Sequence, residues 1–218
     1  MKEKSDVNKY QYYDLFDYVS RVGNYNFNEV NFNIIDALIF ATLSYYYFDF
    51  MKIKENSTLT LFDAVHIYRM YPNLMYEADL KSVRNDFLKY LIEFDRYKNL
   101  ELSNYEHIIS EKAEQQFSAL TIKLNNDTAF ISFSGTDATL IGFKEDFNMS
   151  FLDIIPSQVS AKKYINNKIY KKYKNLYLGG HSKGGNLSLY AGLTSEQIIY
   201  RKIKNIFNFD GPGLSHVI

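Results

Sequence analysis

The pattern with the clearest chemical potential is Gly180-His181-Ser182-Lys183-Gly184. Residues 175–178 predict a strand before it, and residues 184–193 predict a helix after it. A serine set between glycines in this context is the nucleophile elbow of serine hydrolases. The turn forces strained dihedral angles on the serine, and neighbours without a Cβ let the chain fold tightly around it. We therefore predict that Ser182 is an exposed nucleophile and that the Lys183 N–H faces a developing oxyanion.

Other interpretations of these glycines fit less well. A phosphate loop needs a lysine after its second glycine, where this chain has Gly185. A dinucleotide-binding fingerprint needs a second glycine at the position of Ser182. A plain glycine-rich connection stays open as the alternative, although the flanking strand and helix favour the elbow.

A second candidate site is Ser134-Gly135-Thr136-Asp137, at the end of a predicted strand. An α/β-hydrolase places its other oxyanion donor at such a strand end, upstream of the elbow. Thr136 could offer a backbone N–H and a hydroxyl to the same oxygen. A capped turn explains Gly-Thr-Asp equally well, and spacing alone favours that alternative.

A serine nucleophile needs a base, usually a histidine that follows it and an acid in the chain. His66 and His107 come before Ser182, and we expect His66 to be a partly buried helix residue. His181 is adjacent to the serine and should point away from it, supporting the turn. Asp210 and His216 give the order of a triad, but because the base is only six positions after the acid we interpret that order as accidental. We expect this chain, as it stands, to be a poor catalyst.

The elements that must position these residues change in character along the chain. Residues 10–100 are expected to be mainly helical, with candidate helices over 35–43, 62–69 and 79–94. From residue 117 the pattern predicts strands and a helix, and residues 137–155 are expected to be irregular. The strands are expected over 117–124, 128–133, 175–178 and 203–209, with a turn over 125–127 and a helix that opens at Pro156 and includes Ala161, Ile165, Ile169 and Tyr173. Strands that alternate with helices imply a parallel sheet covered by helices.

Composition limits the classes of function. The 25 basic residues balance 25 acidic ones, whereas a nucleic-acid binder usually has a basic surplus. There is no cysteine, so disulfides, thiolate metal sites and a thiol nucleophile are excluded. The longest apolar run, residues 37–48, is shorter than the roughly 20 residues of a membrane span. With no signal-peptide pattern in the first residues, we expect a cytoplasmic protein without a transmembrane segment, a metal or a cofactor.

Several stretches together resemble a known family. They are Gly179-Gly180-His181-Ser182-Lys183-Gly184-Gly185-Asn186-Leu187, Phe209-Asp210-Gly211-Pro212-Gly213, the segment 135–150, and Asp36-Ala37-Leu38-Ile39 with Leu43-Ser44-Tyr45. From about Phe27 onward the chain resembles the Mbeg1-like family, bacterial proteins of unknown function in the α/β-hydrolase superfamily, and more distantly class 3 lipases.

The resemblance implies a lipase-like fold with Ser182 as nucleophile and with Thr136 and the Lys183 N–H as oxyanion hole. Ser134 stands where the family usually has arginine, and Phe143 where it tends to have tryptophan. The family's catalytic histidine lies well beyond the Asp-Gly-Pro-Gly turn. We therefore expect residues 1–218 to form a single α/β-hydrolase-like domain, with its sheet core over 117–218 and its C-terminal strands missing. The expected substrate is a small-molecule or lipid acyl ester, and the alternative is an inactive hydrolase-like protein with a binding or structural role.

Overall fold

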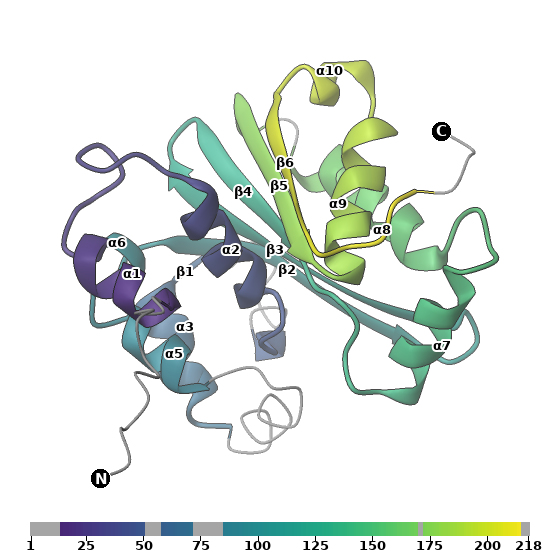
Figure 1. Ribbon diagram of the computed structural model, residues 1–218, viewed down its shortest axis with the longest axis horizontal. Coiled ribbons are helices and arrows are strands. Elements are labelled where there is room, and N and C mark those ends of the chain that lie inside the picture. Colours follow the sequence, from purple (N-terminus) through teal and green to yellow (C-terminus); the bar gives the residue numbers. More distant parts are fainter. Residues whose placement is uncertain (1–13, 51–57, 72–84, 170–171, 215–218) are drawn as a thin grey trace, which may run out of the picture.

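The computed structural model describes residues 14–50, 58–71, 85–169 and 172–214. Its centre is a six-stranded sheet with the strands side by side in chain order. Helices cover the sheet from both sides, one group before β2 in the chain and one group after β4 (Figure 1). The strands are β1 (Leu59–Thr60), β2 (Glu101–Ser110), β3 (Gln115–Asn125), β4 (Thr128–Phe133), β5 (Asn175–His181) and β6 (Ile203–Phe209).

The sheet is mixed. The pairs β1–β2, β2–β3 and β3–β4 are antiparallel, whereas β4–β5 and β5–β6 are parallel. The prediction of a parallel sheet is thus wrong for the first four strands. The short turns at 111–114 and 125–127 join β2 to β3 and β3 to β4, and such turns can only join antiparallel neighbours. The prediction is correct for the last three strands, which are connected through helices. The strands β1 and β2 were not predicted.

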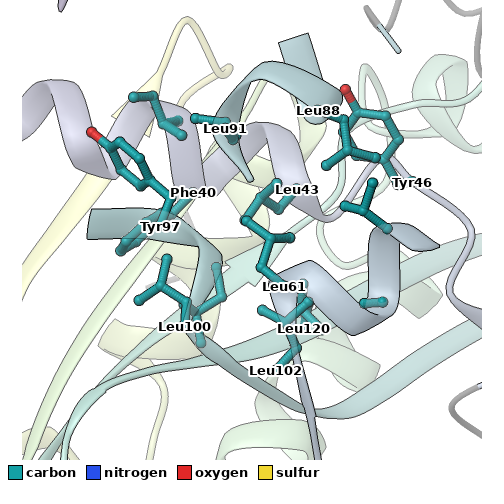
Figure 2. Close-up of a cluster of buried hydrophobic side chains, with 14 of the residues drawn as sticks. Phe40, Leu43, Tyr46, Leu61, Leu88, Leu91, Tyr97, Leu100, Leu102 and Leu120 are labelled. Atoms are coloured by element: carbon teal, nitrogen blue, oxygen red, sulfur yellow. The ribbon is translucent and has the colours of Figure 1, made fainter. Parts of the chain in front are cut away.

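The first group of helices packs on one face of the sheet. It comprises α1 (Leu15–Val22), α2 (Ile34–Leu43), α3 (Leu61–Tyr68), α5 (Asn85–Leu91) and α6 (Asp95–Lys98). The helices predicted over 35–43 and 62–69 are confirmed, and of the one predicted over 79–94, residues 79–84 lie outside the described residues. Figure 2 shows side chains of these helices, such as Phe40, Leu43, Leu61 and Leu91, in one cluster with Leu102 and Leu120 of the sheet. These residues are buried, so this group of helices and the sheet share one apolar core.

A buried ion pair fixes this helical layer. The Arg96 guanidinium donates to both carboxylate oxygens of Asp36, at 2.6 and 3.0 Å, and neither side chain has exposed surface. Arg96 also donates to the carbonyl oxygens of Tyr25 and Val30, at 3.1 and 2.9 Å. The Tyr97 hydroxyl donates to Asp36 at 2.9 Å, so the carboxylate is bonded from several sides. One pair therefore joins α2, α6 and the connection between α1 and α2.

The second group of helices lies on the other side of the sheet. It comprises α7 (Leu140–Asn148), α8 (Pro156–Tyr164), the π-helix η2 (Ile165–Ile169), α9 (Lys183–Leu193) and α10 (Gln197–Tyr200). The helix α7 corrects the expectation of an irregular segment, because the Thr139 hydroxyl caps it by accepting from the Gly142 N–H at 3.0 Å. The helix that opens at Pro156 changes to π geometry at Ile165, and Tyr173 lies beyond it.

Neighbouring residues of β4 belong to different cores, one on each face of the sheet. Phe130 belongs to the core under the first group of helices, whereas Ala129, Ile131 and Phe133 belong to the core under α8 and α9. This alternation follows from the two-residue period of a strand. The sheet is therefore the middle of three layers, and the carboxyl ends of β4 and β5 lie next to each other.

Candidate functional site

Ser182 lies at the turn between β5 and α9. Its dihedral angles are φ 55° and ψ −129°, a conformation that costs a residue with a Cβ about 1–3 kcal/mol. The strained backbone that the motif predicts is thus present, and the serine is partly exposed. Its backbone N–H donates to the Phe209 carbonyl at 2.9 Å, which ties the turn to the end of β6. The surrounding sheet holds the strained conformation in place.

The glycines of the motif allow a close approach between α9 and β4. A Cβ on Gly184 would overlap the carbonyl oxygen of Phe133, the last residue of β4. A Cβ on Gly180 would overlap the backbone of Gly184 and lie 2.5 Å from the same carbonyl oxygen. Because backbone atoms cannot move aside, only glycine fits at these two positions. The first turn of α9 is thereby held against the strand that leads to Thr136.

The segment that carries Thr136 lies beside the turn at Ser182. A Cβ placed on Gly135 would be 2.7 Å from the carbonyl oxygen of His181, the residue before the serine. The Thr136 hydroxyl is buried and has no hydrogen-bond partner among the residues that the structure describes. A buried hydroxyl without a partner is costly, and it is a donor that a bound oxygen could use. The structure thus brings both predicted oxyanion segments to the carboxyl ends of β4 and β5.

The side chain of Lys183 was missed by sequence reasoning, which assigned a role to its N–H alone. It is completely buried, and its ammonium group donates to the main-chain and side-chain oxygens of Gln116, each at 2.7 Å. It also forms an ion pair with Glu145 on α7, at 2.8 Å, with no exposed surface on either side chain. The sequence feature that indicates this role is a lysine inside a tight, glycine-rich turn. Such a lysine is buried, and a buried cation requires an acidic partner.

The side chain of His181 is exposed and bonded to Tyr45, just beyond α2. Its Nδ1 lies 3.0 Å from the Tyr45 hydroxyl, which also donates to the His181 carbonyl at 3.3 Å. Burial raises the pKa of Tyr45 to about 12, with a further increase from the negative charge of Asp146. The phenol therefore stays protonated near neutral pH and links α2 to the turn at Ser182.

The other candidate acid and base residues fall in different places. His66 is exposed on α3, with Nδ1 2.8 Å from the Phe62 carbonyl, so the expectation that it is partly buried is wrong. A helix residue that points away from the sheet has no core to enter. His107 on β2 is bonded to Asp49 at 3.1 Å. His216 lies outside the described residues.

Asp210 lies in the turn that follows β6 and has φ 54°. Its side chain is exposed. The next residue packs against the turn at Ser182, because a Cβ on Gly211 would be 2.5 Å from the Ser182 carbonyl oxygen. The Asn186 side chain of α9 donates to the Gly213 carbonyl at 2.9 Å and holds this turn in place. The turn that contains Asp210 therefore packs on the backbone of Ser182.

The described residues contain no cluster of three or more histidine or acidic side chains placed to hold a metal ion. Within the same residues, no helix has the length and apolar character needed to cross a membrane.

The fold and site define a mixed α/β protein with a strained serine between a parallel strand and a buried helix. The sequence model of the Mbeg1-like family matches residues 91–218, more than half of the chain, and the protein belongs to this family. The match includes the segment of Thr136, the turn at Ser182 and the turn at Asp210, while Tyr45 and the first helices lie before it. Neither curated proteins nor solved structures gave a match.

Proposed function

We propose that this chain is a serine hydrolase of the α/β-hydrolase superfamily, distantly related to class 3 lipases, that cleaves an acyl ester. The observation that carries the proposal is the φ of 55° at Ser182, between a parallel strand and the start of α9. Strained backbone of this kind persists where the surrounding structure enforces it, and such positions cluster at active sites. A nucleophile elbow requires this strand-turn-helix context.

The proposed reaction has two steps. The Ser182 oxygen bonds to the carbonyl carbon of the ester, and the serine proton leaves with the alkoxide as an alcohol. Water then attacks the acyl carbon, the carboxylic acid departs, and the serine regains its proton. In both steps the carbonyl oxygen becomes negative, and the Lys183 N–H and Thr136 would donate hydrogen bonds that stabilise that charge. The helix α9 begins directly after Ser182, so its positive end would add to this stabilisation.

An exposed apolar stripe supports an acyl substrate. Leu140, Phe143, Phe147 and Phe151 lie along α7 and just beyond it, and each is at least 60% exposed. The rings of Phe147 and Phe151 are in contact, at 5.4 Å between centroids. The stripe begins four residues after Thr136, and large apolar side chains that gather on an exposed surface often mark a binding site. An acyl chain is a ligand of matching chemistry.

The proposed reaction also requires a general base that takes the proton of Ser182. The pair that chain order offers is Asp210 with His216, and the short separation between them favours a chain that turns over slowly. Of the described histidines, His181 is bonded to Tyr45 and His107 to Asp49. Loss of the histidine from such a triad costs on the order of 10⁶ in turnover. These contacts also favour a second candidate, an inactive hydrolase-like protein that binds its ligand at the same site.

A fluorophosphonate probe and short- and long-chain p-nitrophenyl esters test the proposal. We expect the probe to modify Ser182, as located by mass spectrometry, and Ser182→Ala to abolish labelling and hydrolysis. The matched control is Ser195→Ala, at a partly exposed serine just beyond α9, and it should change neither labelling nor hydrolysis. We expect slow hydrolysis that His216→Ala leaves unchanged. No labelling of Ser182 would refute the hydrolase, and fast turnover abolished by His216→Ala would show that the short triad is real.

A further inference from the structure

The buried ion pair beside Ser182 belongs to a larger polar network. We use the name Lys183–Glu145 network for the side chains of Lys183, Glu145, Gln116 and Ser157. The Glu145 carboxylate accepts from Lys183 at 2.8 Å, from the Gln116 N–H at 3.0 Å, and from the N–H and hydroxyl of Ser157 at 3.0 and 2.8 Å. All four residues are buried. Both charges are thus hydrogen-bonded several times over, which a buried pair needs in order to persist.

The network reaches both segments that would bind the oxyanion. Gln116 Oε1 accepts from the Lys183 ammonium at 2.7 Å and from the N–H of Asp137 at 3.2 Å. Lys183 directly follows Ser182, and Asp137 directly follows Thr136. One side-chain oxygen on β3 therefore bridges the residue after the nucleophile and the residue after the second donor.

The helix α7 is fixed by the same network. Glu145 is on its buried side, and Asp137 Oδ1 accepts from the Thr139 N–H at 2.9 Å, where the helix begins. A Cβ on Gly142 would lie 3.3 Å from the Thr136 side chain, so the helix start packs directly on that residue. A shift of α7 would therefore move Thr136.

We propose that Glu145 and Gln116 are positioning residues of the Ser182 site, acting through Lys183 and Asp137 to fix the separation of the two oxyanion donors. The inference rests on the proposed function. Donors aimed at a developing oxyanion must be held within about 0.5 Å of the productive geometry. Side chains at the surface cannot supply that rigidity, whereas a dry and fully bonded network does.

The test compares two ion pairs in the full chain. The double variant Lys183→Met/Glu145→Leu removes the pair in the network, and Arg96→Met/Asp36→Leu removes the buried pair in the first group of helices. Replacing both partners avoids leaving one buried charge alone. Labelling of Ser182 by a fluorophosphonate is measured over a range of probe concentrations, at a temperature where circular dichroism shows each protein folded. This separates the maximal labelling rate from the affinity for the probe.

We expect the network variant to label at least about tenfold more slowly at saturation with unchanged probe affinity, since loss of one oxyanion donor costs about 10²–10³. The Arg96→Met/Asp36→Leu control should label at the native rate. Gln116→Met keeps the ion pair and removes the bridging oxygen, so it decides the case if the double variant does not fold. Native labelling rates in these variants would overturn the inference alone. Failure of the native chain to label at Ser182 would overturn the proposed function and the inference with it.

Discussion

Two buried ion pairs have different surroundings in this molecule. Arg96–Asp36 lies within the helical layer on one face of the sheet, and its further bonds go to main-chain carbonyls and to the Tyr97 hydroxyl. Lys183–Glu145 lies where β4 and β5 end, and its further bonds go to Gln116 and Ser157. Both pairs join segments distant in sequence. The first joins segments of the helical layer, whereas the second joins the segments that carry Ser182 and Thr136.

Burial of a charge pair does not by itself identify a functional site, because both pairs are buried and only one lies beside Ser182. A buried pair loses hydration when it forms, and it contributes little net stability compared with well-packed apolar residues. The two pairs differ in where they lie relative to the sheet. The carboxyl ends of parallel strands are where ligands bind in open α/β sheets, and only Lys183–Glu145 lies there.

The largest expected effect comes from breaking the structural pair. Arg96→Met leaves the buried Asp36 carboxylate without its cation, which should lower the free energy of unfolding by about 3–5 kcal/mol. Urea denaturation followed by circular dichroism measures this loss. If Arg96→Met at a temperature where it stays folded also slows labelling of Ser182, the separation between the two pairs is wrong.

Alkaline pH should weaken the hydrogen bond that the Tyr97 hydroxyl donates to Asp36 of the first pair. Burial raises the pKa of the Tyr97 hydroxyl, and the negative charge of Asp36 raises it further. A folded-state pKa above the unfolded value of about 10 gives stability that is fully present below pH 10 and is lost as pH rises further. Tyr97→Phe should cost about 1.5–3 kcal/mol at pH 7, as for a hydrogen bond to a charged group.

The loss in free energy of unfolding caused by Tyr97→Phe should shrink above pH 10, as measured by urea denaturation at a series of pH values. Thr139→Val removes the hydroxyl that accepts from the Gly142 N–H at 3.0 Å, and neither group of that bond titrates in this range. It is therefore the control, and its cost should not change between pH 7 and pH 11. A constant cost for Tyr97→Phe would contradict the role assigned to Asp36.

A smaller effect is expected at the close approach between α9 and β4. Gly184→Ala puts a methyl group onto the Phe133 carbonyl, and overpacking of this kind costs about 1–3 kcal/mol. Gly213→Ala is the control, because nothing lies within 4 Å of a Cβ there. We expect Gly184→Ala to lower both the unfolding midpoint and the labelling of Ser182. Equal stability of the two variants would mean that the packing at Gly184 is looser than described.

Local patterns were predicted from the sequence where their cause is local. The turn at Ser182 followed from glycines within two residues of it, and α2 followed from the apolar spacing over residues 35–43. The turn between β3 and β4 followed from the polar residues at 125–127, although the antiparallel pairing that it produces was not predicted. In each case the residues that determine the structure are neighbours in the chain.

Features set by distant residues were missed. Lys183 meets Gln116 across 67 positions and Glu145 across 38, and no spacing rule connects them. The direction of the first strands was missed because β2 lacks the apolar run of a buried strand and alternates only in part. The helix α7 was missed because its apolar side faces outward, although Thr139 was a readable cap.

The most direct test of the proposed Ser182 site is a crystal structure of the chain after reaction with a fluorophosphonate. We expect a bond between phosphorus and the side-chain oxygen of Ser182. We also expect the phosphoryl oxygen to lie about 3 Å from the backbone nitrogen of Lys183 and from a donor of Thr136. A phosphoryl oxygen turned to solvent, or a probe bonded to another residue, would contradict the proposed site.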